Sequence, residues 1–216
     1  EYMRRFWHPI AMTEEATDLP LPVRILGEDL VLFRDRSGRH GLLHRHCAHR
    51  GTSLEYGIPQ ERGIRCCYHG WCYDIDGTCL ETPGEPPTST LKDRVFQGAY
   101  PVREYGGLVF AYMGPPDEVA DFPLYDTLVY PEGNELVAFS LDYPCNWLQT
   151  HENTVDVMHH VFLHAASSGV QFTPAFGTLP VFEEFETPIG LLSASTRRLG
   201  NTLWARMADM IMPNLA

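Results

Sequence analysis

Several features that would assign the chain to other protein classes are absent from its sequence. None of its 216 residues fall in an apolar run near the roughly 18 residues that a membrane helix needs. Residues 1–7 lack the apolar core of a secretory signal peptide. Basic residues are also scarce, because 16 Lys and Arg stand against 28 Asp and Glu, a formal net charge of −12. We therefore expect a cytoplasmic protein that binds neither nucleic acid nor a membrane.

The six cysteines do not indicate a disulfide framework. Such frameworks are typical of short secreted chains with small cores, whereas hydrophobic residues make up 44% of this sequence. In a reducing compartment, clustered Cys and His are candidate metal ligands. The remaining cysteines are expected to be small core residues: Cys67, Cys72, Cys79 and Cys145.

Short strands separated by turns are predicted for the first half of the chain. Two hairpins are expected, one of residues 23–26 and 30–33 around Gly27-Glu28-Asp29, the other of 71–75 and 78–80 around Asp76-Gly77. A further strand is expected at residues 108–112. No repeats or low-complexity tracts interrupt the pattern.

A Gly- and Pro-rich stretch at residues 114–118 predicts a domain boundary. We place one domain at residues 1–116 and a second at 117–216. In the second we expect a strand at 135–143 and a helix from Asn146, its N-cap, to about residue 166. Two more strands are predicted, at 190–199 and 202–211.

The first group of candidate ligands is a pair of Cys-His motifs. Cys47 and His49 precede Gly51, and Cys66 and His69 precede Gly70. A Rieske cluster uses this set, because in its [2Fe–2S] core two His replace two Cys on one iron. A zinc site is the alternative, but zinc motifs usually pair Cys with Cys and His with His. The glycines permit tight turns that bring backbone N–H groups close to a cluster.

The second group lies in the predicted helix, which carries three histidines after two carboxylates. Glu152, Asp156 and His159 are spaced i, i+4 and i+7, so they share one helix face. His159 and His164 are five residues apart, which places them about 140° apart on a straight helix. If both bind one metal, the helix needs a bulge, a feature common at functional sites. By helix geometry alone, His160 and His164 are the competing pair.

Two His and one carboxylate form the facial triad of oxygen-activating ferrous enzymes. Asp156 is poorly placed as the third ligand if it orients His159 from behind. The carboxylate ligand must then come from elsewhere. Asp209 is available, but we interpret it as structural.

Together the two groups resemble the large (alpha) subunit of Rieske non-haem iron aromatic ring-hydroxylating oxygenases. Both C-x-H…C-x2-H and N-W-x4-E-N-x2-D-x2-H-x4-H are present, in the order of that family. The resemblance covers essentially the whole chain. Three segments look most like the phthalate-oxygenase branch: residues 24–33, 66–71 and 110–114.

The resemblance implies an α+β protein, with an all-β Rieske domain followed by an incomplete helix-grip catalytic domain. It implies that Cys47, His49, Cys66 and His69 hold the [2Fe–2S] cluster, and that His159 and His164, rather than His160, hold a mononuclear Fe(II). It also implies that Asp156 links this iron to the Rieske centre of a neighbouring subunit in a trimer-based assembly. The third iron ligand of the family is an Asp expected beyond Ala216.

The expected function is that of a terminal oxygenase, which uses O2 and electrons from NAD(P)H delivered by a separate flavin/iron-sulfur reductase. The alternatives are a monooxygenase or demethylase of the same family and a Rieske-type electron carrier, which leaves the residue 152–164 segment without a purpose. The branch resemblance suggests an aromatic carboxylate substrate, which needs a cationic partner. Three arginines on predicted strands are candidates: Arg197, Arg198 and Arg206.

Overall fold

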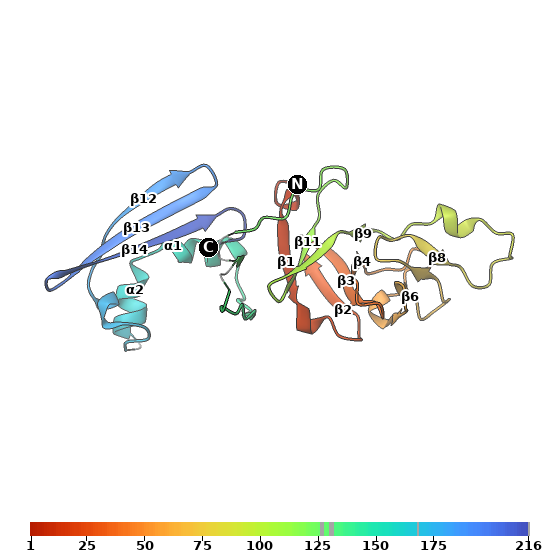
Figure 1. Ribbon diagram of the computed structural model, residues 1–216, viewed down its shortest axis with the longest axis horizontal. Helices are drawn as coiled ribbons and strands as arrows, with labels where there is room; N and C mark the ends of the chain where they lie inside the picture. The colour runs from red at the N-terminus through yellow and green to blue at the C-terminus, as the bar shows by residue number, and fades with distance from the viewer. Residues whose placement is uncertain (126–127, 130–131, 168, 216) are drawn as a thin grey trace. The chain divides into compact units, whose positions relative to one another are not determined.

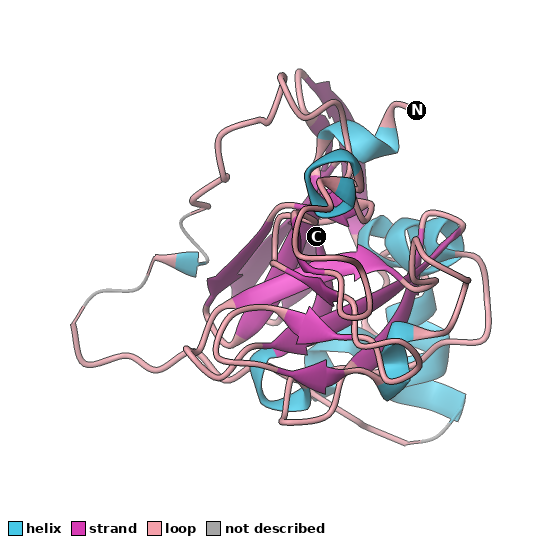
Figure 2. Cartoon of the chain, turned by 90° about the vertical axis from the view of Figure 1, so that its right-hand side faces the viewer, coloured by secondary structure: helices cyan, strands magenta, loops and turns pink. Residues whose placement is uncertain are grey.

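The computed structural model describes residues 1–125, 128–129, 132–167 and 169–215. It divides into two compact units, Glu1–Ser140 and Leu141–Ala216. Strands and loops dominate the described chain, and its helices are short (Figure 2). None of these described helices is long and apolar enough to cross a membrane. The boundary predicted between residues 116 and 117 stays a prediction, and the described part of 117–140 is grouped with the first unit.

The first unit contains three small antiparallel sheets. One has the order β1-β11-β10, the second β2-β3-β4-β9 and the third β5-β6-β7-β8. Their bounds are β1 (Trp7–Met12), β2 (Leu21–Ile25), β3 (Glu28–Arg34), β4 (His40–His44), β5 (Ile58–Pro59), β6 (Ile64–Arg65), β7 (Cys72–Tyr73), β8 (Cys79–Glu81), β9 (Ala99–Tyr100), β10 (Val102–Tyr105) and β11 (Leu108–Tyr112).

Strand β3 separates two hydrophobic cores, which explains why its middle is apolar without interruption. Leu30 and Leu32 point into a cluster with β11, and Val31 and Phe33 point into a cluster on the other face. All four side chains are fully buried. A strand buried on both faces loses the polar alternation of a half-exposed strand. The second of these clusters also contains Cys47 and Cys66, so it is the packing base of the first candidate site.

Both predicted hairpins are present, but each turn lies one residue earlier than predicted. The register pairs Ile25 with Glu28, so the turn is Leu26-Gly27, not Gly27-Glu28-Asp29. Leu26 and Gly27 both have positive φ, 48° and 84°, as a two-residue turn between twisted strands requires. In the other hairpin the Gly77 N–H donates to Asp74 O at 3.0 Å, so the central turn residues are Ile75-Asp76 rather than Asp76-Gly77, and Gly77 follows them at φ 87°.

The second unit combines one sheet with short helices (Figure 1). Strands β12 (Val181–Thr187), β13 (Gly190–Leu199) and β14 (Thr202–Ile211) form an antiparallel sheet in that order. Helix α1 (Trp147–Val155) packs against β14 and β13. It is followed by α2 (His159–Phe162), a π-helix (Leu163–Ser167) and a 3-10 helix (Pro174–Gly177). The two strands predicted at 190–199 and 202–211 are confirmed.

Two predictions for this part of the chain are wrong. The predicted strand at residues 135–143 is not a strand in the described structure, and Val137 and Phe139 are exposed. Residues with high strand propensity form a β-strand only where a neighbouring strand supplies the backbone hydrogen bonds.

The predicted continuous helix over 146–166 is interrupted after Val155. Asn146 does cap its start, since its Oδ1 accepts the Leu148 N–H at 3.0 Å. Asp156 then turns to an extended backbone, ψ 104°, and its Oδ1 accepts the N–H groups of Met158 (2.9 Å) and His159 (3.4 Å). The Asp156 side chain thus takes backbone N–H groups that would otherwise continue α1, and a new helix begins after it.

Candidate functional site

The two Cys-His loops of the first unit share one backbone design. The Cys47 N–H donates to Thr52 O at 2.9 Å, and the Gly51 N–H donates to Cys47 O at 2.8 Å. The second loop repeats this pattern. Its Cys66 N–H donates to Trp71 O at 2.8 Å, and its Gly70 N–H donates to Cys66 O at 3.1 Å. In each loop the glycine four residues after the Cys has positive φ, 72° at Gly51 and 73° at Gly70. Each loop is thereby closed on itself, with its Cys at the base.

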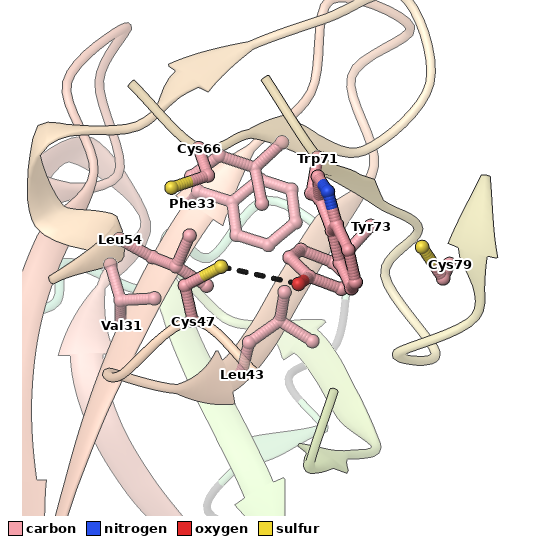
Figure 3. Packing of buried hydrophobic residues seen from close by; sticks show 10 residues of the cluster. Val31, Phe33, Leu43, Cys47, Leu54, Cys66, Trp71, Tyr73 and Cys79 are labelled. Atoms are coloured by element: carbon pink, nitrogen blue, oxygen red, sulfur yellow. Dashed lines mark hydrogen bonds between the residues drawn. The ribbon is translucent and has the colours of Figure 1, made fainter. Parts of the chain in front are cut away.

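The two loops bring their ligand candidates together. The rings of His49 and His69 have centroids 4.5 Å apart, and both Cys47 and Cys66 are only 3% exposed. Figure 3 shows the two cysteines in one cluster, with the Tyr73 hydroxyl 3.2 Å from Cys47 Sγ. The four side chains predicted from sequence are therefore neighbours.

Burial acts differently on the two kinds of ligand: it favours the neutral imidazole and opposes ionisation of the thiol. Burial lowers the pKa of His49, helped by the charges of His69 and Arg50, so its imidazole is kept neutral. Trp71 stacks on the His49 ring with centroids 4.3 Å apart and planes 2° apart. Burial raises the pKa of the Cys66 thiol, while the backbone N–H groups of Tyr68 and His69 act in the opposite direction. Those N–H groups are the donors that a thiolate ligand needs.

The residues fit a dinuclear cluster better than a single ion. His49 Nδ1 is buried and has no hydrogen-bond partner, as expected for a nitrogen reserved for a ligand. Within the described residues, no three His, Cys, Asp or Glu side chains form a group that could hold one metal ion. A [2Fe–2S] cluster needs only two protein ligands for each iron, whereas structural zinc needs four around one ion. The Cys2His2 set, with one Cys and one His from each loop, is thus compatible with the cluster.

The second candidate site lies where α2 passes into the π-helix. The predicted need for a bulge between His159 and His164 is confirmed, since the π-helix begins at Leu163. The His159 and His164 rings have centroids 5.1 Å apart. An imidazole nitrogen lies about 2.1 Å from a bound metal, so two rings at this separation can approach one ion.

Each of these two rings has a polar side chain next to its Nδ1, which is hydrogen-bonded in His164 but only within ion-pair distance in His159. His159 Nδ1 lies 3.3 Å from Asp156 Oδ2, and His164 Nδ1 lies 2.5 Å from Gln171 Oε1. Fixing one nitrogen in this way leaves Nε2 for a metal. Burial raises the pKa of Asp156, but the N–H groups of Met158 and His159 outweigh it and the pKa is lowered. The carboxylate beside His159 is therefore ionised at neutral pH.

His160, the competing ligand, lies in the same cluster but has other neighbours. Its ring packs on Phe176 with centroids 4.6 Å apart, and on His159 at 4.4 Å. Burial, followed by the charges of His159 and Arg206, lowers the pKa of His160 to about 4. Its Nδ1, like that of His159, is buried without a hydrogen-bond partner, but only the His159 Nδ1 has the Asp156 carboxylate 3.3 Å away. The assignment of His159 and His164 stays a prediction.

A cavity of about 510 Å³ opens beside these histidines. Arg206 and aromatic side chains line it, and the Arg206 guanidinium lies 5.1 Å from the Phe176 ring centroid. Of the three candidate arginines, only Arg206 reaches this cavity. Arg197 is 1% exposed and donates to Thr178 O and Val157 O, so it anchors the break between α1 and α2. Arg198 is exposed on the opposite face of the sheet.

Asp209 is not near this site by strand geometry. It lies on β14 three residues from Arg206, so its side chain is on the other face of the sheet. Sequence reasoning missed two contacts of the ligand candidates, Tyr73 to Cys47 and Gln171 to His164. The only sequence feature that points to Tyr73 is its position in a strand that follows the second ligand loop. Gln171 had no signal, because its partner is reached across a loop.

Comparisons with known proteins agree with this geometry. A family model described as Rieske [2Fe-2S] domain matches residues 6–101. The chain is 49% identical, over 99% of its length and 48% of the relative, to the oxygenase subunit of tert-butanol monooxygenase / tert-amyl alcohol desaturase from Aquincola tertiaricarbonis. It is 44% identical to the alpha subunit of phenoxybenzoate dioxygenase from Ectopseudomonas oleovorans, over 100% of the chain and 56% of that protein.

The phthalate branch is also represented, by the oxygenase subunit of phthalate 4,5-dioxygenase from Pseudomonas putida, 39% identical over 81% of the chain and 39% of the relative. The chain spans about half the length of the curated relatives it matches. Among solved structures, Pseudomonas putida CBB5 NdmA with caffeine gives a TM-score of 0.73 at 21% identity, over 98% of this chain and 64% of that one. That likeness supports the fold, a mostly β domain followed by a sheet-and-helix region.

Proposed function

Because the chain belongs to the Rieske non-haem iron oxygenase family, we propose that it acts as a terminal oxygenase component that hydroxylates an aromatic, carboxylated substrate. One observation carries the proposal. The same chain has a Cys2His2 loop pair in its first unit and a histidine cluster beside a cavity in its second. When bound, the [2Fe–2S] cluster would supply single electrons and the mononuclear iron would activate O2.

In this proposal the first unit holds the cluster and shields it from water. The ligands are Cys47, His49, Cys66 and His69. Trp71, 6% exposed and stacked on His49, covers one side of the site. Exclusion of water affects the reduction potential of such a cluster.

In the second unit, His159 and His164 hold the iron, and Asp156 orients His159. The Asp156 carboxylate lies beside His159 Nδ1 and also caps the backbone that carries the ring. It is the residue proposed to link the iron to the cluster of a neighbouring subunit.

The substrate proposal rests on the charge of the cavity. Arg206 lines it among the aromatic rings of Phe172, Phe176 and Trp204, and the buried Arg197 lies next to the same rings. A guanidinium surrounded by aromatic faces suits a planar carboxylate with an aromatic ring. The names of the relatives refer to both a carboxylated substrate and tert-butanol. The relatives alone therefore do not select a carboxylated substrate for this chain, and that part of the proposal rests on the cavity.

A second candidate is monooxygenation or oxidative demethylation. The relative with 49% identity is named a monooxygenase, and another, 44% identical, is named an O-demethylase oxygenase subunit. A simple Rieske electron carrier is the remaining alternative, and it predicts about two irons per chain instead of three. The proposed partners are O2, a flavin/iron-sulfur reductase fed by NAD(P)H, and further copies of the chain in a trimer-based assembly. A cytoplasmic location is proposed too, and the six free cysteines suit it.

The substitution Asp156→Asn tests the proposal in single-turnover experiments. Asn retains an oxygen that can accept the Met158 and His159 N–H groups, so the helix start is kept while the charge beside His159 is removed. We expect the reduced cluster to form normally and product formation to fall by about 100-fold or more. Glu152→Gln, an exposed carboxylate of α1, is the matched control and should turn over normally. Normal turnover by Asp156→Asn would exclude the linking role.

A further inference from the structure

Gln97 is a buried polar residue far in sequence from the ligands, yet its side chain bonds only to the first ligand loop. It is 1% exposed. Its Nε2 donates to His44 O at 2.7 Å and to His46 O at 2.9 Å, and its Oε1 accepts the Ala48 N–H at 2.8 Å. The amide therefore makes three hydrogen bonds to a stretch of five residues.

These bonds surround Cys47. The residue before it and the residue after it are both bonded to the same amide, through His46 O and the Ala48 N–H. His49 follows directly. The internal bonds of the loop, between Cys47, Gly51 and Thr52, set its shape but do not fix it to the rest of the domain. Gln97 supplies such an anchor.

The second ligand loop has no comparable dependence on a distant residue. It lies between the paired strands β6 and β7, and Arg65, next to Cys66, donates to Gly70 O at 2.7 Å. Its anchor is therefore local. The first loop is held instead by a residue about fifty positions further along the chain.

Gln97 is itself fixed by the turn that ends at Gly77. Its N–H donates to Gly77 O at 2.9 Å, and a Cβ at Gly77 would lie 1.9 Å from Gln97 O. The next residue, Gly98, accepts the His44 N–H at 2.7 Å. The backbone of Gln97 thus has little freedom, and its amide is held ready to receive the loop.

We propose that Gln97 is a positioning residue for the iron–sulfur cluster, which sets where the Cys47–His49 loop stands relative to the Cys66–His69 loop. This inference rests on the part of the proposed function that assigns a cluster to these four ligands. Among side chains of this length only Gln supplies two donors and one acceptor on one amide, because Glu lacks the donors and Leu lacks all three groups. Loss of the amide leaves buried backbone groups beside the cluster without partners.

The test compares Gln97→Leu and Gln97→Glu in the full chain loaded with its cluster. The readouts are the EPR g-values, the reduction potential and the rate at which a chelator bleaches the visible absorption. We expect Gln97→Leu to bleach about tenfold faster or more, with shifted g-values, as for a lost buried hydrogen-bond set. Gln97→Glu, which keeps the acceptor for the Ala48 N–H, should fall between it and the native chain.

Two controls separate positioning from general destabilisation. Leu42→Ala removes buried volume from the hydrophobic cluster on the other side of β3, and Asn146→Leu removes another amide, the one that caps α1 in the second unit. Compared at equal thermal stability, both should keep native g-values and potential. If Gln97→Leu does not fold, Gln97→Glu alone is compared with these controls.

Native g-values and bleaching no faster than in Leu42→Ala would overturn the inference and leave the proposed function intact. A native chain that carries no Rieske signal would overturn the proposed function instead.

Discussion

The two candidate metal sites differ in what holds their ligands. In the first unit, both ligand loops are closed by the same pair of backbone hydrogen bonds, and both cysteines are part of a packed core. In the second, the histidines lie on a short helix and a π-helix beside an open cavity, and the carboxylate next to them is half exposed. The first site is shaped for a cofactor that stays bound, and the second keeps room for ligands that enter and leave.

The base of the first site shows the same rigidity. Asp35 and Asp74, each 3% exposed, share Arg39 as an ion-pair partner and tie the β3–β4 hairpin to β7. Asp35 also accepts the N–H of Gly63 at 3.3 Å, in the turn between β5 and β6. A paired and hydrogen-bonded buried carboxylate resists movement, because any displacement leaves it unpaired.

The largest expected effect comes from removing a ligand of the first site. Cys66→Ser should abolish the visible absorption and the inorganic sulfide, because the cluster cannot be held by three ligands and a neutral hydroxyl. The neighbouring Cys67→Ser is the control, since Cys67 is exposed and outside the core. If Cys67→Ser lost the cluster and Cys66→Ser kept it, the ligand assignment would be wrong.

A smaller loss is expected at the second site. His159→Ala should lower the iron content from about three to about two atoms per chain while the Rieske spectrum stays native. His160→Ala, with its ring against Phe176, should keep the third iron. The opposite result, measured by metal analysis, would favour the His160–His164 pair.

Substrate affinity should change next. Arg206→Ala removes the cation that lines the cavity and should weaken binding of an aromatic carboxylate by about 10- to 100-fold, as for a lost charge-assisted hydrogen bond. The affinity for the matching primary amide should change little. Arg198→Ala, on the other face of the sheet, is the control. Equal affinity of the Arg206→Ala variant for the carboxylate, measured by calorimetry, would remove the basis for a carboxylated substrate.

The smallest effect concerns cysteines that hold no metal. Burial raises the pKa of Cys72 to about 11, so at pH 8 only about one thiol in a thousand is ionised. Cys67 and Cys145, which were expected to be core residues, are exposed, so they should react with a thiol reagent within minutes, and Cys72 should not. Raising the pH toward 11 should speed labelling of Cys72 if the fold is kept. Rapid labelling of Cys72 at pH 8, found by mass spectrometry, would mean that the core around β7 opens.

The sequence predicted the first unit well because its signals are local. The turn that ends at Gly77 and the apolar run of Leu30 to Phe33 each depend on a few adjacent residues. The Cys-His spacing also named four side chains that the fold brings together. The first turn was predicted one residue too late. A turn that starts at Gly27 was favoured because Leu rarely adopts the positive φ that Leu26 has.

The second unit was predicted less well because its structure depends on competition between groups. Helical spacing from Glu152 to His159 suggested one continuous helix, yet the Asp156 side chain takes the backbone donors that would continue it. The π-helix was foreseen only as a consequence of assuming that His159 and His164 share an ion. Gln97 could not be recognised at all, since nothing near it in sequence reveals the loop that it holds.

Counting iron, zinc and acid-labile sulfide in the purified native chain tests the central claim most directly. The account predicts about two sulfides and about three irons per chain, with the visible absorption and EPR signal of a Rieske centre. A colourless protein that carries zinc and no sulfide would contradict it.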